Sequence, residues 1–502
     1  MLRNERQSSD VLDAVSTSTD IIVLGAGYAG LAAAALLAAE GRDVTVLEAH
    51  ATLGGCASFF REGAMTFDVG ATTFSGVEPH QPAGRVFARL GITPELVQQD
   101  PGMIIRMDGQ DIVRHADPDT WIDTMCRMFP SGDQRGFWSY LYRIEAASYD
   151  LIRDRPYLPP ATLRDVVRML HPSNVRALPL VPGLIRPVAH IMRRFGVDTD
   201  PRFLRFVNEQ LLISTQQHAS NAPYLPGALG LTYPSSTWYP VGGMYRPALL
   251  MMRSITARGG RVHFRRKVTS IQRRKGAWQV ATQNGETYTA RAVVSSIPIW
   301  NMPDLTDGPV RSWMQRHARS NADIWSAVTL YLGVEGRPNL PTAYYQIHVD
   351  TPLPHCASDT VFVTVSRPDD DAKAPAGVST VTVSTHARWT DWQTTSAEAY
   401  ATQRERVINA ILGVLERQLP EIGLLPRIYV GAGMPQTWVH YTHRHHGFVG
   451  GIPHNVRRPM LLLPPNQTPF AGLYMIGDTA FPGQGTPAVM LGAWNTVERI
   501  ME

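Results

Sequence analysis

The first regular pattern in the chain is a short apolar run, IIVL at residues 21–24, which has the β-branched character of a buried parallel strand. A glycine-rich stretch at 25–30 follows, and the strong helix-forming segment LAAAALLAAEG comes next. A second apolar run at 43–48 ends on an acidic residue, Glu48. The pattern therefore predicts a strand, a glycine turn, a helix and a second strand within about 30 residues.

The glycine turn has the spacing of a dinucleotide-binding motif. Gly25 allows the tight turn, Gly27 lets backbone approach a pyrophosphate, and Gly30 lets the helix pack on the strand. The helix N-terminus would then present unpaired N–H groups to the diphosphate. Glu48 lies 23 residues after Gly25 and can accept hydrogen bonds from both ribose hydroxyls of an adenosine. The unit therefore predicts a dinucleotide site.

The residues after Glu48 favour FAD over NAD. A glycine-rich loop and an extended stretch stand where an NAD domain would continue with another regular βα unit. Further on, 259–271 predicts a β-hairpin and 292–298 a buried strand. Near the end, LYMIGD at 473–478 predicts a strand that ends in Gly-Asp. A helix follows at about 486–501, and Thr486 and Pro487 are typical N-terminal residues for it.

These patterns predict an α/β protein with a Rossmann-type FAD-binding domain and an inserted α+β substrate-binding domain. The cofactor domain would be discontinuous and made of residues 21–75, 236–300 and 455–502. The substrate-binding part would come from 76–235 and 301–454, which lack glycine motifs and hold most of the Trp, Tyr and Met. Residues 1–20 are polar, which predicts a mobile tail with no secretory signal. The acidic stretch RPDDDAKAPAG around Lys373 predicts a solvated loop.

Composition narrows the function. The 47 basic and 43 acidic residues leave a net charge of +4 in 502 residues, so nothing global indicates nucleic-acid binding. The hydrophobic share is 44%, which indicates a globular chain. The three cysteines are Cys56, Cys126 and Cys356. They have no metal-ligand spacing, which favours a reduced, cytoplasmic protein without a metal site.

One segment, 151–196, combines basic and apolar character. It has eight arginines against Asp154 and Asp165, a net charge of +6, and apolar patches such as ALPLVPGLI lie between them. No window approaches the roughly 18 uninterrupted apolar residues of a membrane-spanning helix. The segment predicts helices that contact an anionic membrane surface peripherally, and an ordinary solvated helical face is the alternative.

Three stretches together resemble one branch of a known superfamily. They are VLGAGYAGLAAAALLAAEGRDVTVLEAHATLGG near the start, YPVGGMYRPALLMMRSITARGGRVHFRRKVTSI in the middle and GLYMIGDTAFPGQGTPAVMLGA near the end. The chain is similar to the carotenoid desaturase and carotenoid cis-trans isomerase branch, the phytoene-desaturase-like branch, of the FAD-dependent amine-oxidase-like superfamily. The closing Gly-Asp-x-x-x-Pro-Gly-x-Gly-x-Pro is the most specific of these motifs.

The resemblance implies a role for each matching residue. It assigns the FAD pyrophosphate to the three motif glycines and the adenosine ribose to Glu48. It assigns the diphosphate and ribityl region to Gly54, Gly55, Gly477 and Asp478. Val268 would hold adenine through its backbone. Thr486 and Pro487 would lie beneath the flavin pyrimidine, where a helix N-terminus stabilises negative charge on the reduced flavin.

The lysines argue against amine oxidation. Amine oxidases of the superfamily usually place a lysine near flavin N5, and Lys267, Lys275 and Lys373 are all of the lysines in this chain. The first two belong to the predicted adenine-side hairpin and the third to the acidic loop. No cysteine is close in sequence to the C-terminal flavin motif, which argues against a covalent cysteinyl flavin.

The resemblance implies a lipophilic polyene as substrate. Desaturation removes a hydride and a proton, so it needs a proton acceptor beside the flavin. Asp68, His443 and His445 are the main candidates, with His440, His446 and His454 behind them. The alternative to a catalytic role is a structural role for Asp68. For the histidines, the alternatives are a position in a solvated turn or a contact with a phosphate. Isomerisation needs no net redox change, and oxygen or a quinone would reoxidise the flavin. A polyene saturase, an amine oxidase and a non-redox prenyl-lipid binding protein remain as rivals.

Overall fold

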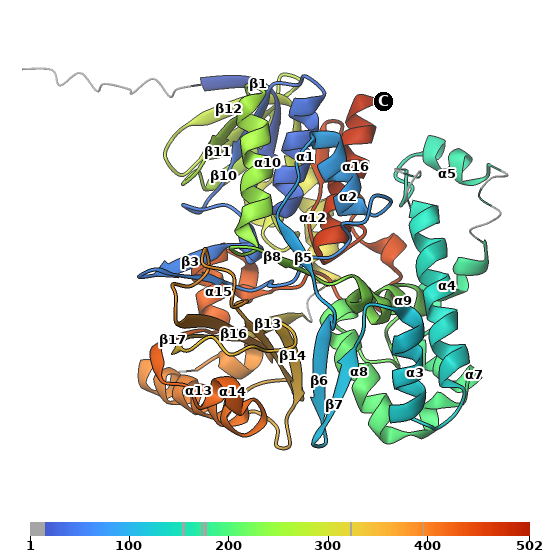
Figure 1. The fold of residues 1–502 in the computed structure, drawn as a ribbon. Coiled ribbons are helices and arrows are strands. Elements are labelled where there is room, and N and C mark those ends of the chain that lie inside the picture. Colours follow the sequence, from blue (N-terminus) through green and yellow to red (C-terminus); the bar gives the residue numbers. More distant parts are fainter. Residues whose placement is uncertain are drawn as a thin grey trace, which may run out of the picture.

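The computed structural model describes residues 16–152, 155, 157–171, 174, 178–321, 324–394 and 396–502. The predicted tail up to residue 15, together with Arg153, Asp154 and Arg176 of the basic segment, lies outside the described residues. Figure 1 shows two packed regions, each built on a sheet. The predicted α/β class is confirmed.

The first sheet carries the glycine turn. Its strands run in the order β10-β11-β12-β1-β2-β9, and β18 pairs with β12. Their bounds are β1 Ser16–Leu24, β2 Val44–Leu47, β9 Arg261–His263, β10 Val268–Arg274, β11 Ala277–Thr282, β12 Thr287–Ser295 and β18 Leu473–Met475. β1 pairs in parallel with β2 and β12, so the sheet around the turn is parallel, as the apolar runs predict.

Alternate residues of β1 belong to opposite cores. Ile21 and Val23 pack with the helices α1 (Tyr28–Ala39), α10 (Tyr245–Ala257) and α16 (Thr486–Met501). Ile22 and Leu24 pack with residues of the β10–β12 strands and α12 (Gly308–Arg319). Burial on both faces explains why the strand is continuously apolar.

Three details of this region differ from the predictions. β1 begins at Ser16, because the polar residues 16–19 pair with 287–290 of β12, so the tail boundary at residue 20 was wrong. The predicted 259–271 hairpin was also wrong, because β9 pairs with β2 and β10 pairs with β11. Lys275 and Gly276, both with positive φ, make the real hairpin turn.

The domain boundary after residue 75 is the third difference. Helix α2 (Pro82–Leu90) falls within the predicted substrate-binding part, yet its apolar face belongs to the same core as α1 and α16. Its Val86 and Phe87 are buried there. The first region therefore extends past α2 before the chain enters the second.

The second sheet runs in the order β17-β13-β16-β15-β14-β6-β7. Its strands are β6 Met103–Met107, β7 Gln110–Arg114, β13 Trp325–Glu335, β14 Tyr344–His348, β15 Thr360–Val365, β16 Val378–Arg388 and β17 Arg427–Gly433. One face is apolar and packs with α13 (Ala397–Gln418) and α14 (Pro420–Gly423). The other face of β13 to β17 carries many polar and aromatic residues and turns toward the first region, above it in Figure 1.

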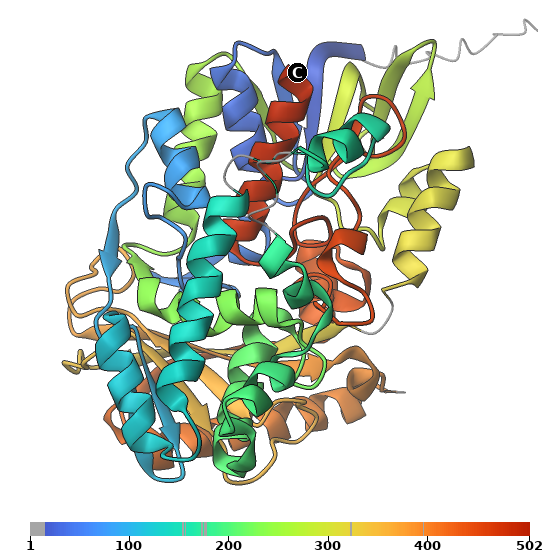
Figure 2. The ribbon, with the colours of Figure 1, turned by 90° about the vertical axis from the view of Figure 1, so that its right-hand side faces the viewer.

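A helical layer flanks β6 and β7 (Figures 1 and 2). It contains α3 (Pro118–Met128), α4 (Gln134–Ile152), α7 (Val188–Arg194), α8 (Pro201–Thr215) and α9 (Tyr224–Thr232). The other elements that matter below are η1 Gly55–Ala57, β3 Phe59–Glu62, β4 Met65–Asp68, β5 Leu96–Gln98, α5 Leu163–Met169, α6 Pro182–Ile185, β8 Trp238–Pro240, α11 Met302–Leu305, α15 Pro435–Thr442, η6 His445–Gly447 and η7 Met460–Leu462. Across the described stretches of the chain, no helix is both long and apolar enough to cross a bilayer.

Candidate cofactor site and substrate cavity

The glycine turn lies between β1 and α1. Gly25 has φ +95°, and a Cβ there would overlap the Ser296 hydroxyl. A Cβ on Gly30 would overlap the Gly25 carbonyl oxygen, which shows how closely the helix packs on the turn. Gly27 is the N-cap of α1 and has no side chain to cap the helix, so the first N–H groups of the helix remain available to an anion.

Glu48 follows β2 and turns back toward this helix. Its carboxylate accepts hydrogen bonds from the backbone N–H groups of Ala26 at 2.6 Å and His50 at 2.7 Å. Burial raises the pKa of Glu48, and these backbone donors oppose the shift. Each carboxylate oxygen has a further lone pair, so the group still has acceptors for a ribose.

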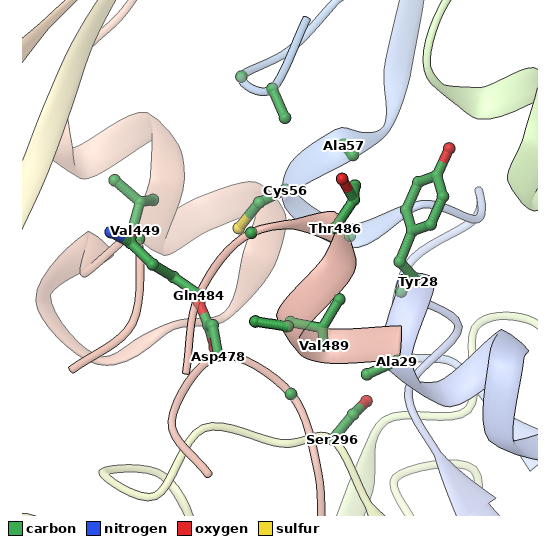
Figure 3. A pocket seen from close by; sticks show the side chains of 18 of the residues that line it. Tyr28, Ala29, Cys56, Ala57, Ser296, Val449, Asp478, Gln484, Thr486 and Val489 are labelled. Atoms are coloured by element: carbon green, nitrogen blue, oxygen red, sulfur yellow. The ribbon is translucent and has the colours of Figure 1, made fainter. Parts of the chain in front are cut away.

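A second group of predicted cofactor residues comes from the C-terminal end of the chain. Gly477 and Asp478 follow β18, and α16 begins at Thr486 with Gly485 as an N-cap that has φ +91° and no side chain. Figure 3 shows Asp478, Thr486 and Cys56 around the same space. The sequence distance between Cys56 and this motif had argued against a cysteine here, and that inference was wrong.

Asp478 has a charged partner that the sequence did not indicate. Its carboxylate lies 2.7 Å from the guanidinium of Arg444, which is largely buried. Cys56 lies beside the same pair, and burial raises the pKa of its thiol. The Asp478 carboxylate is thereby held in a fixed orientation beside the cavity.

One cavity of about 1410 Å³ is lined by Gly25, Gly27, Glu48, Cys56, Arg444, Gly477, Asp478, Gly485 and Thr486, whereas Gly30 is not part of its described wall. Gly54 forms a backbone bridge with Gly27, Gly55 lies next to it, and Val268 lines the cavity at the start of β10. The residues fit an FAD well: two uncapped helix N-termini, glycine backbone that a Cβ would obstruct, and a half-buried acid after β2. The predicted cofactor residues from both ends of the chain therefore come together.

The predicted catalytic residues Asp68, His443 and His445 do not come together at the cavity. Asp68 is buried in β4 and, among the described residues, is not part of the cavity wall; it accepts a hydrogen bond from Met244 N at 2.8 Å. This geometry agrees with the alternative interpretation of Asp68, a structural role. His443 lines the cavity, and its pKa is lowered by burial and by nearby Lys267 and His50, so it lies beside the residues that follow β2 and precede β10.

His445 also differs from its predicted role. It belongs to the short helix η6. Its ring contacts His446 and Phe448, and it is absent from the described cavity lining. Of the histidines that the sequence raised as proton acceptors, His454 lies in a different place: it is 6% exposed, lines the cavity and packs against Gly483.

Lys373 is a further correction. The acidic loop was expected to be solvated, but Lys373 and Asp370 are each 2% exposed. Lys373 forms an ion pair with Asp68, and Asp370 accepts hydrogen bonds from the Tyr239 hydroxyl and the Gly242 N–H, both at 2.8 Å. These two charged side chains turn inward because they have buried partners from β4 and the β8–α10 connection, whereas Asp369 and Asp371 on the same loop stay exposed, as predicted.

Beyond the cofactor residues, the cavity wall becomes largely apolar. This part is formed by Leu158, Met169, Leu178, Leu180, Val181, Leu184, Leu225, Leu229, Met460 and Leu461. Aromatic residues from the second sheet and α15 add Tyr331, Tyr344, Phe362 and Trp438. Trp438 and Tyr441 line the space, whereas Phe74 is fully buried in the core of the first region.

A two-sheet fold with a long cavity and two glycine-rich helix N-termini defines a flavoprotein oxidoreductase. Residues 28–501 match the family of flavin-containing amine oxidoreductases, and the chain belongs to this family. The predicted superfamily and FAD as cofactor are confirmed.

Individual relatives and a solved structure are similar to this chain over nearly its whole length. Prolycopene isomerase 1, chloroplastic, of an Oncidium hybrid cultivar is 25% identical over 507 residues, which cover 96% of this chain and 83% of the relative. Carotenoid 3,4-desaturase of Haloarcula japonica is 25% identical over 512 residues, covering 96% and 98%. The crystal structure of a CLA-producing fatty acid isomerase from P. acnes superposes with a TM-score of 0.60 at 14% identity, over 96% of this chain and 99% of that one, and shows the same fold.

Proposed function

We propose that the protein is an FAD-dependent enzyme that desaturates a long polyene or isomerises its cis and trans double bonds. The single observation that carries the proposal is the cavity. It continues from the cofactor residues to an apolar end, where Leu178 and Val181 line it and are themselves 62% and 48% exposed. A long apolar molecule can therefore extend from the protein surface to the cofactor. The carotenoid-directed names of two relatives support this substrate class.

Desaturation removes a hydride from one carbon and a proton from its neighbour. Bound FAD supplies the hydride acceptor. For the proton we propose His454, because it is buried, lines the cavity and has an Nδ1 atom with no hydrogen-bond partner among the described residues. Burial lowers its pKa to about 4, so the ring is neutral near pH 7 and keeps a free lone pair, although the low pKa makes it a weak base.

Two rivals within the fold have less support. An amine oxidase would need a lysine at the flavin, and Lys373 instead forms a buried ion pair with Asp68. A non-redox lipid-binding protein would not need the cofactor residues, which are intact at Gly25, Gly30 and Glu48. A polyene saturase would use the same cavity with the redox direction reversed.

The experiment starts from purified protein, which should be yellow and release FAD on denaturation. It is mixed anaerobically with lycopene or poly-cis lycopene in liposomes, once with oxidised and once with reduced flavin. A red-shifted polyene with bleached flavin indicates desaturation, and an altered cis band without flavin change indicates isomerisation. A colourless protein that cannot take up FAD, or unchanged spectra with every polyene, would overturn the proposal.

We also propose peripheral membrane contact through an apolar surface segment. This surface consists of Leu163, Val166, Val167, Leu170, Leu178, Val181 and Ile185, all of them between 44% and 80% exposed. Large contiguous exposed apolar patches on a soluble protein mark interaction sites. Basic side chains on the same segment, such as Arg186 and Arg193, would attract anionic lipids.

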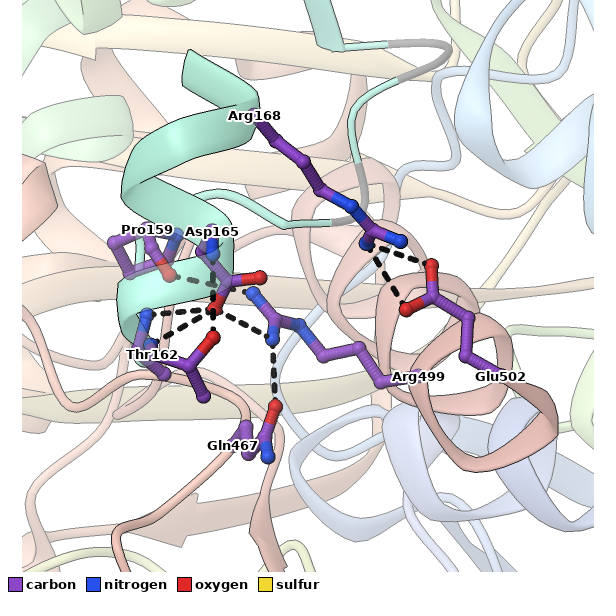
Figure 4. A network of polar contacts seen from close by, with 8 residues as sticks. Pro159, Thr162, Asp165, Arg168, Gln467, Arg499 and Glu502 are labelled. Atoms are coloured by element: carbon purple, nitrogen blue, oxygen red, sulfur yellow. Dashed lines mark hydrogen bonds and ion pairs between the residues drawn. The ribbon is translucent and has the colours of Figure 1, made fainter. Parts of the chain in front are cut away.

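Helix α5 carries part of this surface. In contrast to an ordinary surface helix, it turns charged residues toward the protein and apolar residues toward solvent. Its polar residues bind the body of the protein: Asp165 pairs with Arg499 at 3.1 Å, and Arg168 with Glu502 at 2.9 Å (Figure 4). Leu163 and Leu170 are 80% and 79% exposed instead. We infer that the exposed leucines enter the lipid interface, from which the substrate would reach the cavity.

The electron acceptor is proposed to be oxygen or a membrane quinone. A quinone is itself a lipid, so the apolar end of the cavity would admit it by the same route as the substrate. Mixing the reduced enzyme with aerated buffer, or anaerobically with a quinone in liposomes, distinguishes the two by the rate at which the flavin band returns.

A further inference from the structure

The floor of the cavity is polar where the second sheet forms it. On β16, Ser384 and His386 face the cavity, while Val383 before them and Ala387 after them belong to the core behind the sheet. Their neighbours across the strands are Thr329 and Phe362 for Ser384, and Ala327 for His386. Two residues of one strand face are about 7 Å apart, so a single small group can lie between these two side chains.

Most of the polar side chains on this floor form hydrogen bonds with other residues of the protein. The Tyr331 hydroxyl donates to the Val69 carbonyl at 2.6 Å, and the Tyr344 hydroxyl donates to the Thr72 carbonyl at 3.0 Å. Thr364 bonds the Thr72 hydroxyl at 2.8 Å, and Thr329 lies 3.0 Å from the Tyr331 hydroxyl. These residues therefore hold the 69–72 segment against the sheet.

Ser384 and His386 differ from those neighbours. Neither side chain has a hydrogen-bond partner within the part of the chain that the structure describes; the ring of His386 only meets the Trp325 ring edge-on at 5.9 Å. The predicted FAD contacts come from other elements, namely the β1–α1 turn, η1, β10 and the β18–α16 loop. A pure hydrocarbon on this floor would leave both polar groups unpaired, which is unfavourable in a buried site.

We propose that Ser384 and His386 bind an uncharged oxygen atom, a hydroxyl or a carbonyl, carried by the polyene substrate. The inference rests on the proposed function and narrows its substrate class from hydrocarbon to oxygenated polyene. The serine hydroxyl both donates and accepts, and a neutral imidazole has one donor and one acceptor, so the pair suits either group. The rest of the wall, including Leu225 and Leu229, suits the apolar body of the molecule.

The charge state of His386 selects against a carboxylate. Burial lowers its pKa to about 4, so the ring is uncharged near pH 7 and offers no positive charge to an anion. The other groups facing this part of the floor from neighbouring strands, at Thr329, Ala327 and Phe362, are also uncharged. A polyene acid would therefore lose its hydration without gaining an ion pair.

The test uses one carbon skeleton with different end groups: retinol, retinal, retinoic acid and the hydrocarbon axerophtene. Binding to the FAD-loaded enzyme is followed by the shift of the flavin absorption band. We expect retinol and retinal to bind about tenfold or more tightly than axerophtene and retinoic acid, because an unpaired polar site rejects the molecule that lacks the oxygen.

Substitutions test whether Ser384 and His386 cause the preference for retinol. Ser384→Ala and His386→Phe should each reduce the preference for retinol to about threefold or less while the FAD content stays at wild-type level. Ser384→Thr, which keeps the hydroxyl, should retain the preference, and so should Thr382→Val, on the same strand face but outside the described cavity lining.

Two results would overturn the inference. The first is a series in which retinol is not preferred, including one in which no retinoid perturbs the flavin. The second is loss of FAD from the Ser384 and His386 variants, which would assign these residues to the cofactor. If lycopene is converted in either case, the proposed function stands while the oxygen site does not.

Discussion

The Lys373 ammonium lies 2.5 Å from the Asp68 carboxylate, and the two side chains are only 3% and 0% exposed. The other oxygen of Asp68 accepts the Met244 N–H, and the Lys373 carbonyl accepts the Thr66 N–H at 2.8 Å. The hydroxyl of Tyr28, in the first turn of α1, donates to the Met244 carbonyl. The ion pair thus connects β4, the acidic loop and the β8–α10 connection to the helix that receives the cofactor.

The first prediction concerns this pair. Lys373→Met should lower the free energy of unfolding by about 3–5 kcal/mol, because it leaves the Asp68 charge buried without a counter-charge. The double variant Lys373→Met with Asp68→Asn should recover part of that loss, since the remaining group is then uncharged. Urea unfolding measures all three proteins. Lys275→Met in the exposed β10–β11 turn is the control, and an equal effect of Lys275→Met and Lys373→Met would contradict the prediction.

The sequence predicted the strand-turn-helix-strand unit around the glycine turn because its signals are local. Gly25, Gly30 and Glu48 belong to one short strand-turn-helix-strand unit, whose packing is decided by neighbours within that unit. Thr486 and Pro487 likewise indicate a helix start from adjacent residues alone.

The errors concern residues whose partners are distant in sequence. Lys373 has the surroundings of a surface loop, and its burial depends on Asp68, about 300 residues earlier. Cys56 reaches Arg444 and Asp478 only through the fold. Ser384 and His386 look like ordinary alternating strand residues, and pairing with β13 and β15 is what brings their face to the cavity. Polar alternation on 380–386 was the available signal for the last of these, and it was missed.

The second prediction tests the glycine turn. Gly30→Ala should abolish FAD binding, because the added Cβ would overlap the Gly25 carbonyl oxygen and push α1 away from the turn. The flavin absorption per polypeptide after purification measures the effect. Gly413→Ala in α13 adds the same methyl group to a helix where only the flexible Arg417 side chain is close, so FAD content should be unchanged. Yellow Gly30→Ala protein with full FAD occupancy would refute this account of the turn.

The third prediction concerns the apolar surface around α5. Leu163→Glu with Leu170→Glu should reduce co-sedimentation with anionic liposomes about tenfold or more, since two exposed leucines would no longer enter the interface. Stability should hardly change, because the polar face of α5 still binds Arg499 and Glu502.

Leu424→Glu is the matched control for this experiment. Leu424 is 69% exposed but follows α14, at the far end of the molecule from α5 in Figure 1. Liposome binding should survive that change. Equal losses in both variants would indicate a general loss of solubility or fold, and no loss in the α5 variant would exclude this surface as the membrane contact.

The last prediction follows from the burial of His454. Burial lowers its pKa from 6.5 to about 4 in the folded protein, so between these values the unfolded chain binds the extra proton. Stability from this group is therefore present at pH 7 and is lost as the pH falls. From pH 7.0 to 5.5 the loss for one such histidine is about 1 kcal/mol. Urea unfolding at the two pH values measures it.

A variant isolates the contribution of this histidine from those of other groups. His454→Asn removes the titrating ring, so the decrease in stability between pH 7.0 and 5.5 should be smaller than in the wild type by about that 1 kcal/mol. His218→Gln, which replaces a histidine at an exposed position, is the matched control. Because His454 meets the cavity beside Gly483, the same proton would also place a positive charge at the cavity wall. An identical pH dependence in wild type and His454→Asn would mean that water reaches the ring and keeps its pKa near the unfolded value.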